Sequence, residues 1–520
     1  MSVLLRAFSL GEDTLTIQLA LDICRGDLPL KISSATVEKL QANRDIVGQI
    51  VAGQDAVYGI NTGFGPLCST RISREDTNQL QTNIIKSHSV GMGDPVPDEV
   101  AKLMLILKLQ ALCQAHSGIE VATLRRLQWH VEQDIIPVVP EQGSVGASGD
   151  LAPLAHLFLP LIGLGWVKEK GVKKPAAEVL QAQGLAPIQL GAKEGLALIN
   201  GTQFIAAYAI LVVEKMHNCL AHADLIGAMM VDGLLGSRKP FLAALHQLRP
   251  YPGNQHVAQR LYQLLEGSDI IPSHVNCQRV QDPYSLRCMP QVHGASRTAW
   301  LHLKEATQIE LNAVTDNPVI FSDGRTISGG NFHGQPLALP LDYACLAASE
   351  IGNISDRRSY LSLMGIADGV PKLLMQETGT NSAFMMLQYT SAALASENKG
   401  LCFPASADSI PTSLGQEDHV SMGSISGRKA LQVCGNVEKI LAVEMLCAAQ
   451  ALDFHHPLKT GPYLEEVHQE IRRHISHAEA DRVFAEDMEK SLQLIQDKSL
   501  LRLIQEDSLG SPHHTLFESY

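Results

Sequence analysis

The sequence predicts an all-α fold made of long helices, because helical periodicity runs through most of the chain and strand patterns are scarce. Apolar residues recur at i, i+3, i+4 and i+7, the spacing of a helix with a buried face. Five segments show it clearly: 99–116, 205–231, 296–313, 336–365 and 419–452. The last segment extends for about nine turns with apolar residues on more than one side, which is typical of a central member of a helix bundle.

Local signals predict where several elements begin and end. Asp418 is a candidate N-cap for the last long helix, and His455-His456-Pro457 is a candidate stop. Asp150 and Pro153 suit the start of another helix. Asp-Gly in segment 319–327 predicts a tight hairpin, and a second hairpin is expected around 165–172. The tail after Gln505 is expected to be loosely held.

We expect two regions without a linker between them. Residues 1–200 form a mixed, loop-rich N-terminal helical region with an Ala-Ser-Gly loop, and residues 201–520 form the long-helix bundle and the C-terminal helices. Charged residues make up 18% of the chain, against roughly 25% in an average soluble domain. So little charge suits a chain that buries extra faces against copies of itself.

Charge, apolar runs and cysteine pattern narrow the environment of the protein. A net charge of −13 disfavours nucleic acid as a partner, because phosphate requires a cationic surface. The most apolar run, residues 151–166, contains two prolines and a histidine and is too short for a membrane span of about 20 residues. The N-terminus lacks a secretory signal pattern, and the ten cysteines are scattered, so we expect a cytoplasmic protein.

No metal site is expected from the spacing of histidines and cysteines. The groups His217/Cys219/His222 and His474/His477 have spacings that a metal could use, but neither has an evident third ligand. Packed or solvated helix faces are the better explanation for these histidines and cysteines. No phosphate loop or dinucleotide motif is present either.

A glycine-rich loop, Gly-Ser-Val-Gly-Ala-Ser-Gly-Asp at residues 143–150, precedes the apolar helix. One interpretation is an ordinary loop at the start of a helix. The other is chemical: the amide nitrogen of Gly149 closes a five-membered ring on the carbonyl carbon of Ala147, and loss of two waters leaves Ser148 as an electrophilic methylene. Glycine removes a Cβ that would block the bend, alanine limits crowding, and serine supplies the leaving hydroxyl. The triplet alone is weak evidence, so its context decides.

That context resembles the aromatic amino acid ammonia-lyases, which form a methylidene-imidazolone group from Ala-Ser-Gly. The string GSVGASGDLAPLAH resembles their signature, and the likeness extends from the tyrosine-glycine motif that begins at Tyr58 to Gln416-Glu-Asp-His-Val-Ser-Met. The resemblance implies a long-helix bundle of the fumarase/ammonia-lyase type, assembled as a homotetramer whose active sites draw on three subunits. It also implies that the group forms autocatalytically, with no external cofactor.

The resemblance assigns roles to three residues in glycine-containing or polar motifs. Tyr58 matches the catalytic base and lies on a lid-like loop. Asn200 matches a residue that hydrogen-bonds near the electrophile and the substrate, and Phe332 matches an aromatic beside the prosthetic group. From the residues alone, a surface turn, a turn cap and core packing explain these three positions as well.

The string that begins at Gln281 supplies the expected anchor for the substrate. Arg287 offers a planar fork suited to a carboxylate, although a solvated polar loop is the alternative. By resemblance, Tyr284 assists at the amine and the electrophile, and Gln281 supports the site. Met289 and His293 depart from the family pattern, so affinity or selectivity could differ from that of typical members.

Two positions bear on the substrate. His88 matches the position that recognises the substrate side chain, although a structural role is the usual explanation for a lone histidine in a helix. Glu417 matches the branch that acts on histidine, whereas relatives that act on tyrosine or phenylalanine typically carry Asn-Gln-Asp there. A carboxylate gains a charge-assisted hydrogen bond from a basic imidazole or from the substrate amine, and little from a phenol. We therefore expect elimination of ammonia from L-histidine to give urocanate, the first step of histidine degradation.

Three alternatives remain open at this point. A tyrosine or phenylalanine ammonia-lyase, or an aminomutase, would share every motif except Glu417. A non-catalytic helical oligomer descended from the lyases is disfavoured by the intact Tyr58, Ser148 and Arg287 motifs. A helical lyase of the fumarase type would not need the Ala-Ser-Gly loop.

Overall fold

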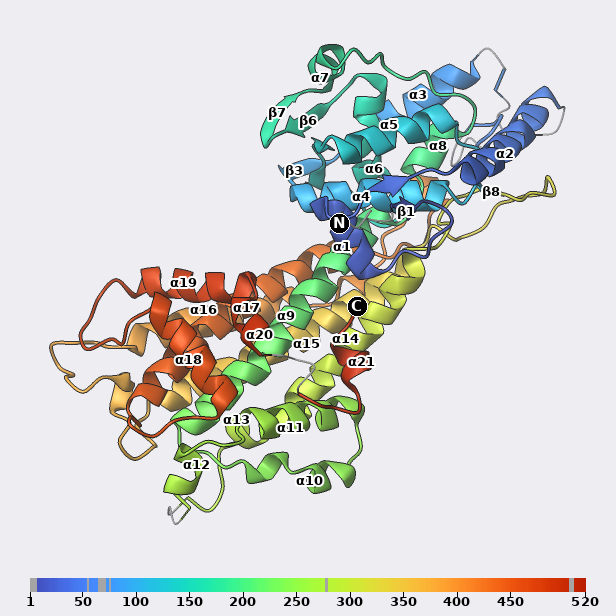
Figure 1. The fold of residues 1–520 in the computed structure, drawn as a ribbon. Helices are drawn as coiled ribbons and strands as arrows, with labels where there is room; N and C mark the ends of the chain where they lie inside the picture. Colours follow the sequence, from blue (N-terminus) through green and yellow to red (C-terminus); the bar gives the residue numbers. More distant parts are fainter. Residues whose placement is uncertain (1–6, 54–55, 64–71, 74–75, 276–278, 505–508) are drawn as a thin grey trace, which may run out of the picture.

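The computed structural model describes residues 7–53, 56–63, 72–73, 76–275, 279–504 and 509–520. Helices make up 59% of it and strands 6%, which confirms the all-α prediction. Figure 1 shows a bundle of long helices below and a loop-rich cap of shorter helices and small sheets above. The predicted boundary near residue 200 falls between α8 (Glu194–Ile199) and α9 (Gln203–Gly233), and the division into two domains stays a prediction.

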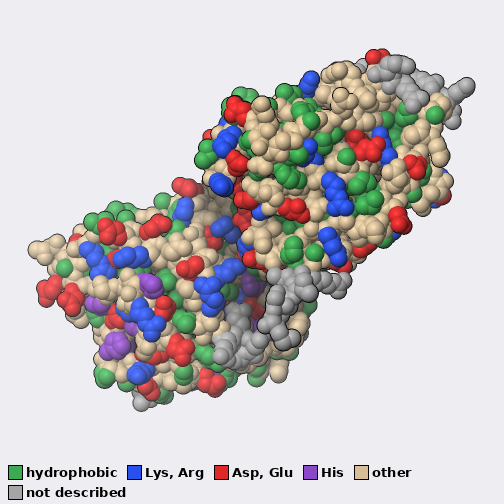
Figure 2. Space-filling view, turned by 45° about the horizontal axis from the view of Figure 1, so that its top comes forward, with side chains coloured by type: hydrophobic (Ala, Val, Ile, Leu, Met, Phe, Trp, Pro, Cys, Tyr) green, Lys and Arg blue, Asp and Glu red, His purple; other side chains and the backbone are tan. Residues whose placement is uncertain are grey.

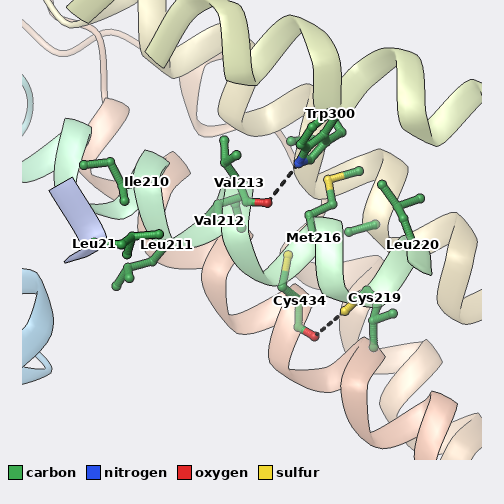
Figure 3. Close-up of a cluster of buried hydrophobic side chains, with 14 of the residues drawn as sticks. Leu21, Ile210, Leu211, Val212, Val213, Met216, Cys219, Leu220, Trp300 and Cys434 are labelled. Carbon is green, nitrogen blue, oxygen red and sulfur yellow. Dashed lines mark hydrogen bonds between the residues drawn. The ribbon is translucent and has the colours of Figure 1, made fainter. Parts of the chain in front are cut away.

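Four long helices form the centre of the bundle: α9, α14 (Met289–Glu310), α15 (Gln335–Ser362) and α17 (Gly423–Asp453). All four correspond to segments predicted from periodicity. Figure 3 shows two side-chain hydrogen bonds in the core, which link α9 to α14 and to α17. The indole Nε1 of Trp300 on α14 donates to the carbonyl oxygen of Val213 on α9 at 2.9 Å, and the thiol of Cys219 on α9 contacts the carbonyl oxygen of Cys434 on α17 at 3.7 Å.

Helix α9 is long and apolar enough to cross a membrane by composition alone. However, 89% of its most apolar window is buried inside the protein. It is therefore the core helix of the bundle, surrounded by α14, α15 and α17. On the face shown in Figure 2, Lys and Arg side chains are intermixed with Asp and Glu over both halves of the molecule.

The start of α17 differs from the prediction, and its end agrees. Asp418 does not cap the helix, which begins at Gly423 after Met422 in the left-handed conformation (φ 54°). The amide of Met422 donates to the carbonyl oxygen of Val145 at 3.0 Å, so a tertiary contact with the glycine-rich loop keeps this segment out of the helix. The helix ends at Asp453, just before the predicted stop.

Both predicted hairpins are confirmed. Strand β8 pairs with β9 across Asp323-Gly324, and β6 pairs with β7; β6 also pairs with β4 in a three-stranded antiparallel sheet. The other two sheets are a parallel β1–β2 pair and an antiparallel β3–β5 pair. The strands are β1 Phe8–Ser9, β2 Leu30–Lys31, β3 Met92–Pro95, β4 Ile135–Pro137, β5 Pro140–Gln142, β6 Trp166–Glu169, β7 Val172–Pro175, β8 Val319–Ile320 and β9 Thr326–Ile327.

The remaining helices cover the cap, surround the bundle and close the C-terminal end. Those of the cap are α1 Ile17–Arg25, α2 Ser34–Ala52, α3 Thr77–His88, α4 Asp98–Leu112, α5 Val121–Glu132, α6 Leu151–Phe158 and α7 Ala176–Ala182. Those around the bundle are α10 Ala243–Gln247, α11 Pro252–Leu264, α12 Ile270–Ser273, α13 Tyr284–Arg287, α16 Met385–Leu401, α18 Pro462–His474, α19 Phe484–Gln496, α20 Ser499–Leu503 and α21 His514–Phe517. Short 3₁₀ turns lie at Leu159–Ile162, Lys239–Phe241, Lys372–Leu374, Ala405–Ala407 and Ser413–Gly415.

The C-terminal tail is held firmly, so the expectation of a loose tail is wrong for residues 509–520. Leu509 and Phe517 are buried, and the Glu518 side chain is only 2% exposed. Its Oε1 lies 2.6 Å from His256 Nε2 and 3.3 Å from Arg260 Nη1. An acidic residue near the chain end thus closes a buried cluster of positive groups, which composition alone does not reveal.

Replacing Glu518 by Gln should lower the free energy of unfolding by about 3 kcal/mol, because it removes one of the two carboxylates, Glu518 and Asp224, that balance the charges of the buried Arg260 and Arg297. Burial alone would raise the pKa of Glu518, but Arg260 together with His217 and His256 holds it well below its usual range. The contribution of Glu518 to the free energy of unfolding is therefore fully present above the unfolded pKa of about 4.3, and it is lost progressively as pH falls from there through the much lower folded pKa. Urea unfolding at pH 7 and at stepwise lower pH measures this, with the exposed Glu479→Gln as control. Equal losses of free energy of unfolding in Glu518→Gln and Glu479→Gln would contradict this role of Glu518.

Candidate active site

The Ala147-Ser148-Gly149 loop lies in close contact with the segment before α9. Ser148 and Gly149 both have left-handed backbones, with φ of 51° and 79°. The amide of Gly201 donates to the carbonyl oxygen of Ser148 at 3.2 Å, and the amide of Asp150 donates to the carbonyl oxygen of Gly201 at 2.8 Å. A Cβ on Gly149 would lie 2.1 Å from the oxygen of Gly201, so only glycine fits here.

The carboxylate of Asp150 caps α9 rather than its own helix α6, which corrects the simple prediction of an N-cap. It is fully buried and accepts from the amides of Phe204 and Ile205 at 3.1 and 3.0 Å. Ser144 also donates to it, at 3.3 Å. Burial raises the pKa of Asp150 to about 7. The start of α9 and the loop are therefore held together through one buried acid.

Ser148 faces a cavity of about 420 Å³ that brings four predicted site residues together: Tyr58, Ser148, Phe332 and Glu417. The hydroxyl of Ser148 donates to Glu417 Oε1 at 3.1 Å. The other oxygen of Glu417 accepts from the hydroxyls of Thr412 and Ser413. The continuation of the Tyr58 motif, Phe64 and Gly65, lies outside the described residues.

A second cavity of about 320 Å³ adjoins the first and contains His88. Ala147 and Glu417 also line it, so Glu417 borders both cavities. The Nδ1 of His88 lies 3.0 Å from the hydroxyl of Ser87. Burial lowers the pKa of His88, opposed by its contact with the backbone of Ile84 and by the charge of Glu417. A neutral imidazole beside a carboxylate suits recognition of a polar side chain.

Asn200 lies in a buried polar network directly behind the loop. Its amide nitrogen donates to Asp316 Oδ1 at 3.2 Å and to the carbonyl oxygen of Asn317 at 3.0 Å. Its Oδ1 is buried and finds no hydrogen-bond partner among the described residues, so an acceptor remains free. The ammonium of Lys193 lies 2.7 Å from Asp316 Oδ2, and that of Lys108 lies 2.6 Å from the backbone oxygen of Asn200.

Lys108, Lys193 and Asp316 belong to this region, although none of them lies in a motif that predicts a site. A signal existed for Lys108, which interrupts an otherwise apolar stretch of α4 and is 2% exposed in the structure. A lysine at such a position must be buried with a partner. Its partner is 92 positions away in sequence, which local patterns cannot indicate.

Gln281, Tyr284 and Arg287 are not brought to Ser148 within one chain. They lie at and just before α13, near the lower end of the bundle, whereas α6 and the loop before it lie in the upper part (Figure 1). Gln281 is exposed, Tyr284 is 72% exposed, and the guanidinium of Arg287 lies 4.7 Å from the Tyr284 ring. The Nε of Arg287 donates to the carbonyl oxygen of Asp282 at 2.8 Å, which leaves its outer nitrogens directed elsewhere.

Met289 and His293, the two departures from the family pattern, are buried in the bundle. His293 Nδ1 lies 2.8 Å from Asp224 Oδ1, and Arg297 lies 2.6 Å from the other oxygen of the same carboxylate. Met289 packs against Gly227. An effect of these residues on affinity stays a prediction, and any such effect would be transmitted through the core.

Within the described ranges, one group of side chains has the proximity of metal ligands: Asp453, His456 and His468. Arg472 and His477 each lie 2.6 Å from Asp453 Oδ2, so this carboxylate belongs to an ionic network. The eight described cysteines are free thiols, and Cys68 and Cys277 lie outside the described residues.

Comparison with known proteins extends the likeness over nearly the whole chain. The family profile described as "Aromatic amino acid lyase" matches residues 15–473. Histidine ammonia-lyase of Myxococcus xanthus is 44% identical, covering 95% of this chain and 97% of the relative. That of Gloeobacter violaceus is 46% identical, covering 93% and 94%.

Solved structures agree with the sequence comparison. The crystal structure of histidine ammonia-lyase from Trypanosoma cruzi superposes with a TM-score of 0.90 at 38% identity, covering 98% of this chain and 97% of that one. Tyrosine aminomutase from Streptomyces globisporus superposes with a TM-score of 0.91 at 33% identity, covering 96% and 99%. Fold and sequence together define a carbon–nitrogen lyase. The chain belongs to the aromatic amino acid lyase family.

Proposed function

We propose that this protein eliminates ammonia from L-histidine to give urocanate, with a methylidene-imidazolone formed from Ala147, Ser148 and Gly149. The observation that carries the proposal is the placement of Ser148. It projects from a loop with no room for a Cβ at Gly149, into a cavity that also contains Tyr58, Phe332 and Glu417. An ordinary helix-entry loop has no need of this arrangement.

The residues of the loop fit the formation of this group. When the Gly149 nitrogen bonds to the Ala147 carbonyl carbon, the carbonyl oxygen leaves as water with the amide hydrogens of Gly149 and Ser148. A second water takes the hydroxyl and the Cα hydrogen of Ser148, so no oxidant or reductant is needed. The successive left-handed backbones at Ser148 and Gly149 support such a bend. When present, the group supplies an electrophile that turns the substrate amine into a better leaving group.

The residues around the cavity supply the rest of the chemistry. Tyr58 acts as the base that removes the β-proton of the substrate. Asn200 offers its free Oδ1 to a donor near the electrophile, and Phe332 closes the apolar side of the cavity. His88 and Glu417 border the adjoining cavity and bind the substrate side chain.

We further propose that the active site is completed by other subunits of a homotetramer in the cytoplasm. Arg287 holds the substrate carboxylate, Tyr284 assists at the amine, and Gln281 supports them, but all three lie far from Ser148 in one chain. The exposure of Tyr284 and of apolar side chains such as Leu339, Tyr343 and Leu346 along α15 supports a contact with further copies.

A complementation experiment tests the shared site. Tyr58→Phe and Arg287→Lys chains should each be nearly inactive alone, because each removes one essential group. If each site takes the two residues from different chains, each of these chains carries the intact residue in about one half of the cases. Chains co-expressed in equal amounts should therefore regain about one quarter of the native activity. Recovery close to zero would show that both residues come from the same chain. A tagged pair, purified through both tags, confirms that mixed oligomers form.

Glu417 supports histidine over the aromatic alternatives. A carboxylate bonded to Thr412 and Ser413 is fixed in place and can accept from an imidazole N–H. The named histidine ammonia-lyases are 44–46% identical among the sequence relatives and 38% identical for the solved structure, whereas the named tyrosine aminomutase is 33% identical. In a tyrosine- or phenylalanine-specific lyase or aminomutase this acid would gain little from the substrate side chain.

Replacing Glu417 by Gln should lower kcat/KM for histidine by about 10–100-fold, the value of a hydrogen bond to a charged group. Turnover of tyrosine should change far less, so the ratio of the two substrates is the readout. Because Glu417 also contacts Ser148, intact mass must first show that the variant has lost two waters. The native protein should act on histidine faster than on tyrosine or phenylalanine; the reverse order would refute the proposed substrate.

A further inference from the structure

Lys108 is a buried lysine near the loop, and the proposed chemistry does not use it. Unlike Lys193, it forms no ion pair with a described carboxylate. It lies on α4 and is 2% exposed, and the hydrogen bonds of its ammonium group to the described residues go to amide oxygens: the backbone oxygen of Asn200 at 2.6 Å and Oε1 of Gln203 at 3.5 Å. The nearby Asp316 is already paired with Lys193 at 2.7 Å. Burial lowers the pKa of Lys108 to about 7. Placing an amine here is costly for folding, so an apolar side chain would be more favourable unless the amine has a task.

Lys108 contacts the Asn200-Gly201 peptide, which is also the peptide that lies against the loop. Asn200 is followed by Gly201, whose amide and carbonyl bond to Ser148 and Asp150. The same Gly201 carbonyl occupies the space where a Gly149 Cβ would lie. A shift of the Asn200-Gly201 peptide therefore directly changes how closely the Gly149 nitrogen is held toward Ala147.

The segment 200–205 is fixed from two sides. Asp150 holds its C-terminal end through the amides of Phe204 and Ile205. Lys108 holds its N-terminal end through the Asn200 oxygen, from a helix whose other faces are packed in the core. With both bonds in place, the segment acts as a rigid surface behind the loop.

We propose that Lys108 is a positioning residue for ring closure of Ala147-Ser148-Gly149, acting through the Asn200-Gly201 peptide. The inference rests on the proposed function and deepens it. Lys108 contacts neither substrate nor reacting atoms. It restricts the position of the Asn200-Gly201 peptide, which lies against Gly149. Loss of its bond leaves the chain folded but with the loop free to relax, so that ring closure becomes slow while finished sites work normally.

The test compares Lys108→Met with Lys102→Met, the same change on the same helix. Lys102 pairs with Asp134 at the surface, away from the loop. Folded protein is isolated by size exclusion, its melting temperature is recorded, and intact mass gives the fraction of chains that have lost two waters. Lys108→Met should reduce the rate of ring closure about tenfold, the effect of one lost hydrogen bond to a charged group. Lys102→Met should match the native protein.

Kinetics distinguish positioning from a general loss of structure. In Lys108→Met, kcat per total chain should fall in proportion to the cyclised fraction while KM for histidine stays unchanged. If Lys108→Met does not fold, Lys108→Gln, which keeps a polar group at the position, enters the same comparison. A folded variant that cyclises at the native rate overturns the inference, as does equal impairment in Lys102→Met. A native chain that has lost no water would instead overturn the proposed function itself.

Discussion

Ser148→Ala should abolish turnover of histidine while leaving the fold intact. Alanine has no hydroxyl to leave as water, so the methylene cannot form and the amine must depart without activation. We expect a loss of at least about 10³-fold in kcat, equivalent to about 4 kcal/mol in the barrier. Among the described residues, the serine side chain makes one hydrogen bond, to Glu417, so little stability depends on it.

Steady-state assays at saturating histidine, together with melting temperatures, check this expectation. The surface variant Ser476→Ala serves as the control for purification and handling, since its side chain is exposed. A Ser148→Ala protein that melts like the native one and retains more than about a tenth of its activity would contradict an electrophile derived from Ser148.

Gly149→Ala should prevent ring closure altogether. The added Cβ would lie 2.1 Å from the Gly201 oxygen, and φ at this position is 79°, which alanine adopts at a cost of about 1–2 kcal/mol. The loop must therefore move away from Gly201, and Gly149 is no longer held toward Ala147. Intact mass should show no loss of water, and activity should be absent.

Gly171→Ala is a matched control that measures only the cost of placing alanine at a positive φ, without a steric clash of the added Cβ. Gly171 has a φ of 77°, nearly the same as Gly149, but nothing lies within 4 Å of an added Cβ. It should lose a little stability and cyclise completely. If Gly149→Ala also cyclises completely, the close contact with Gly201 has no part in forming the group.

The periodic pattern predicts the bundle well because each long helix buries an apolar face over many turns. Segments 205–231 and 336–365 lie within two or three residues of α9 and α15 at both ends. Helix ends are less predictable when a tertiary contact competes with a local cap. Asp418 is a good cap by type, yet the hydrogen bond from Met422 to Val145 keeps the segment out of the helix until Gly423.

Pairing between residues far apart in the sequence explains why several site residues could not be predicted from local patterns. Asp150 suits a local cap by type, but its buried carboxylate bonds α9, some 50 residues away. Lys193 and Asp316 pair over 123 positions, beyond any local motif. Glu518 shows the same limit, because its partners lie more than 200 residues earlier. Family motifs identify Ser148, Tyr58 and Glu417 because they occur as strings, and the structure then places these three around one cavity.

The central claim is that this chain builds its own electrophile, and intact mass of the native protein tests it most directly. The chain should be lighter than its sequence requires by two waters, after allowance for removal of the first methionine. Proteolysis should then locate the loss in the peptide that contains Ala147, Ser148 and Gly149. A native, soluble chain at its full sequence mass, with that peptide unchanged, would contradict the account.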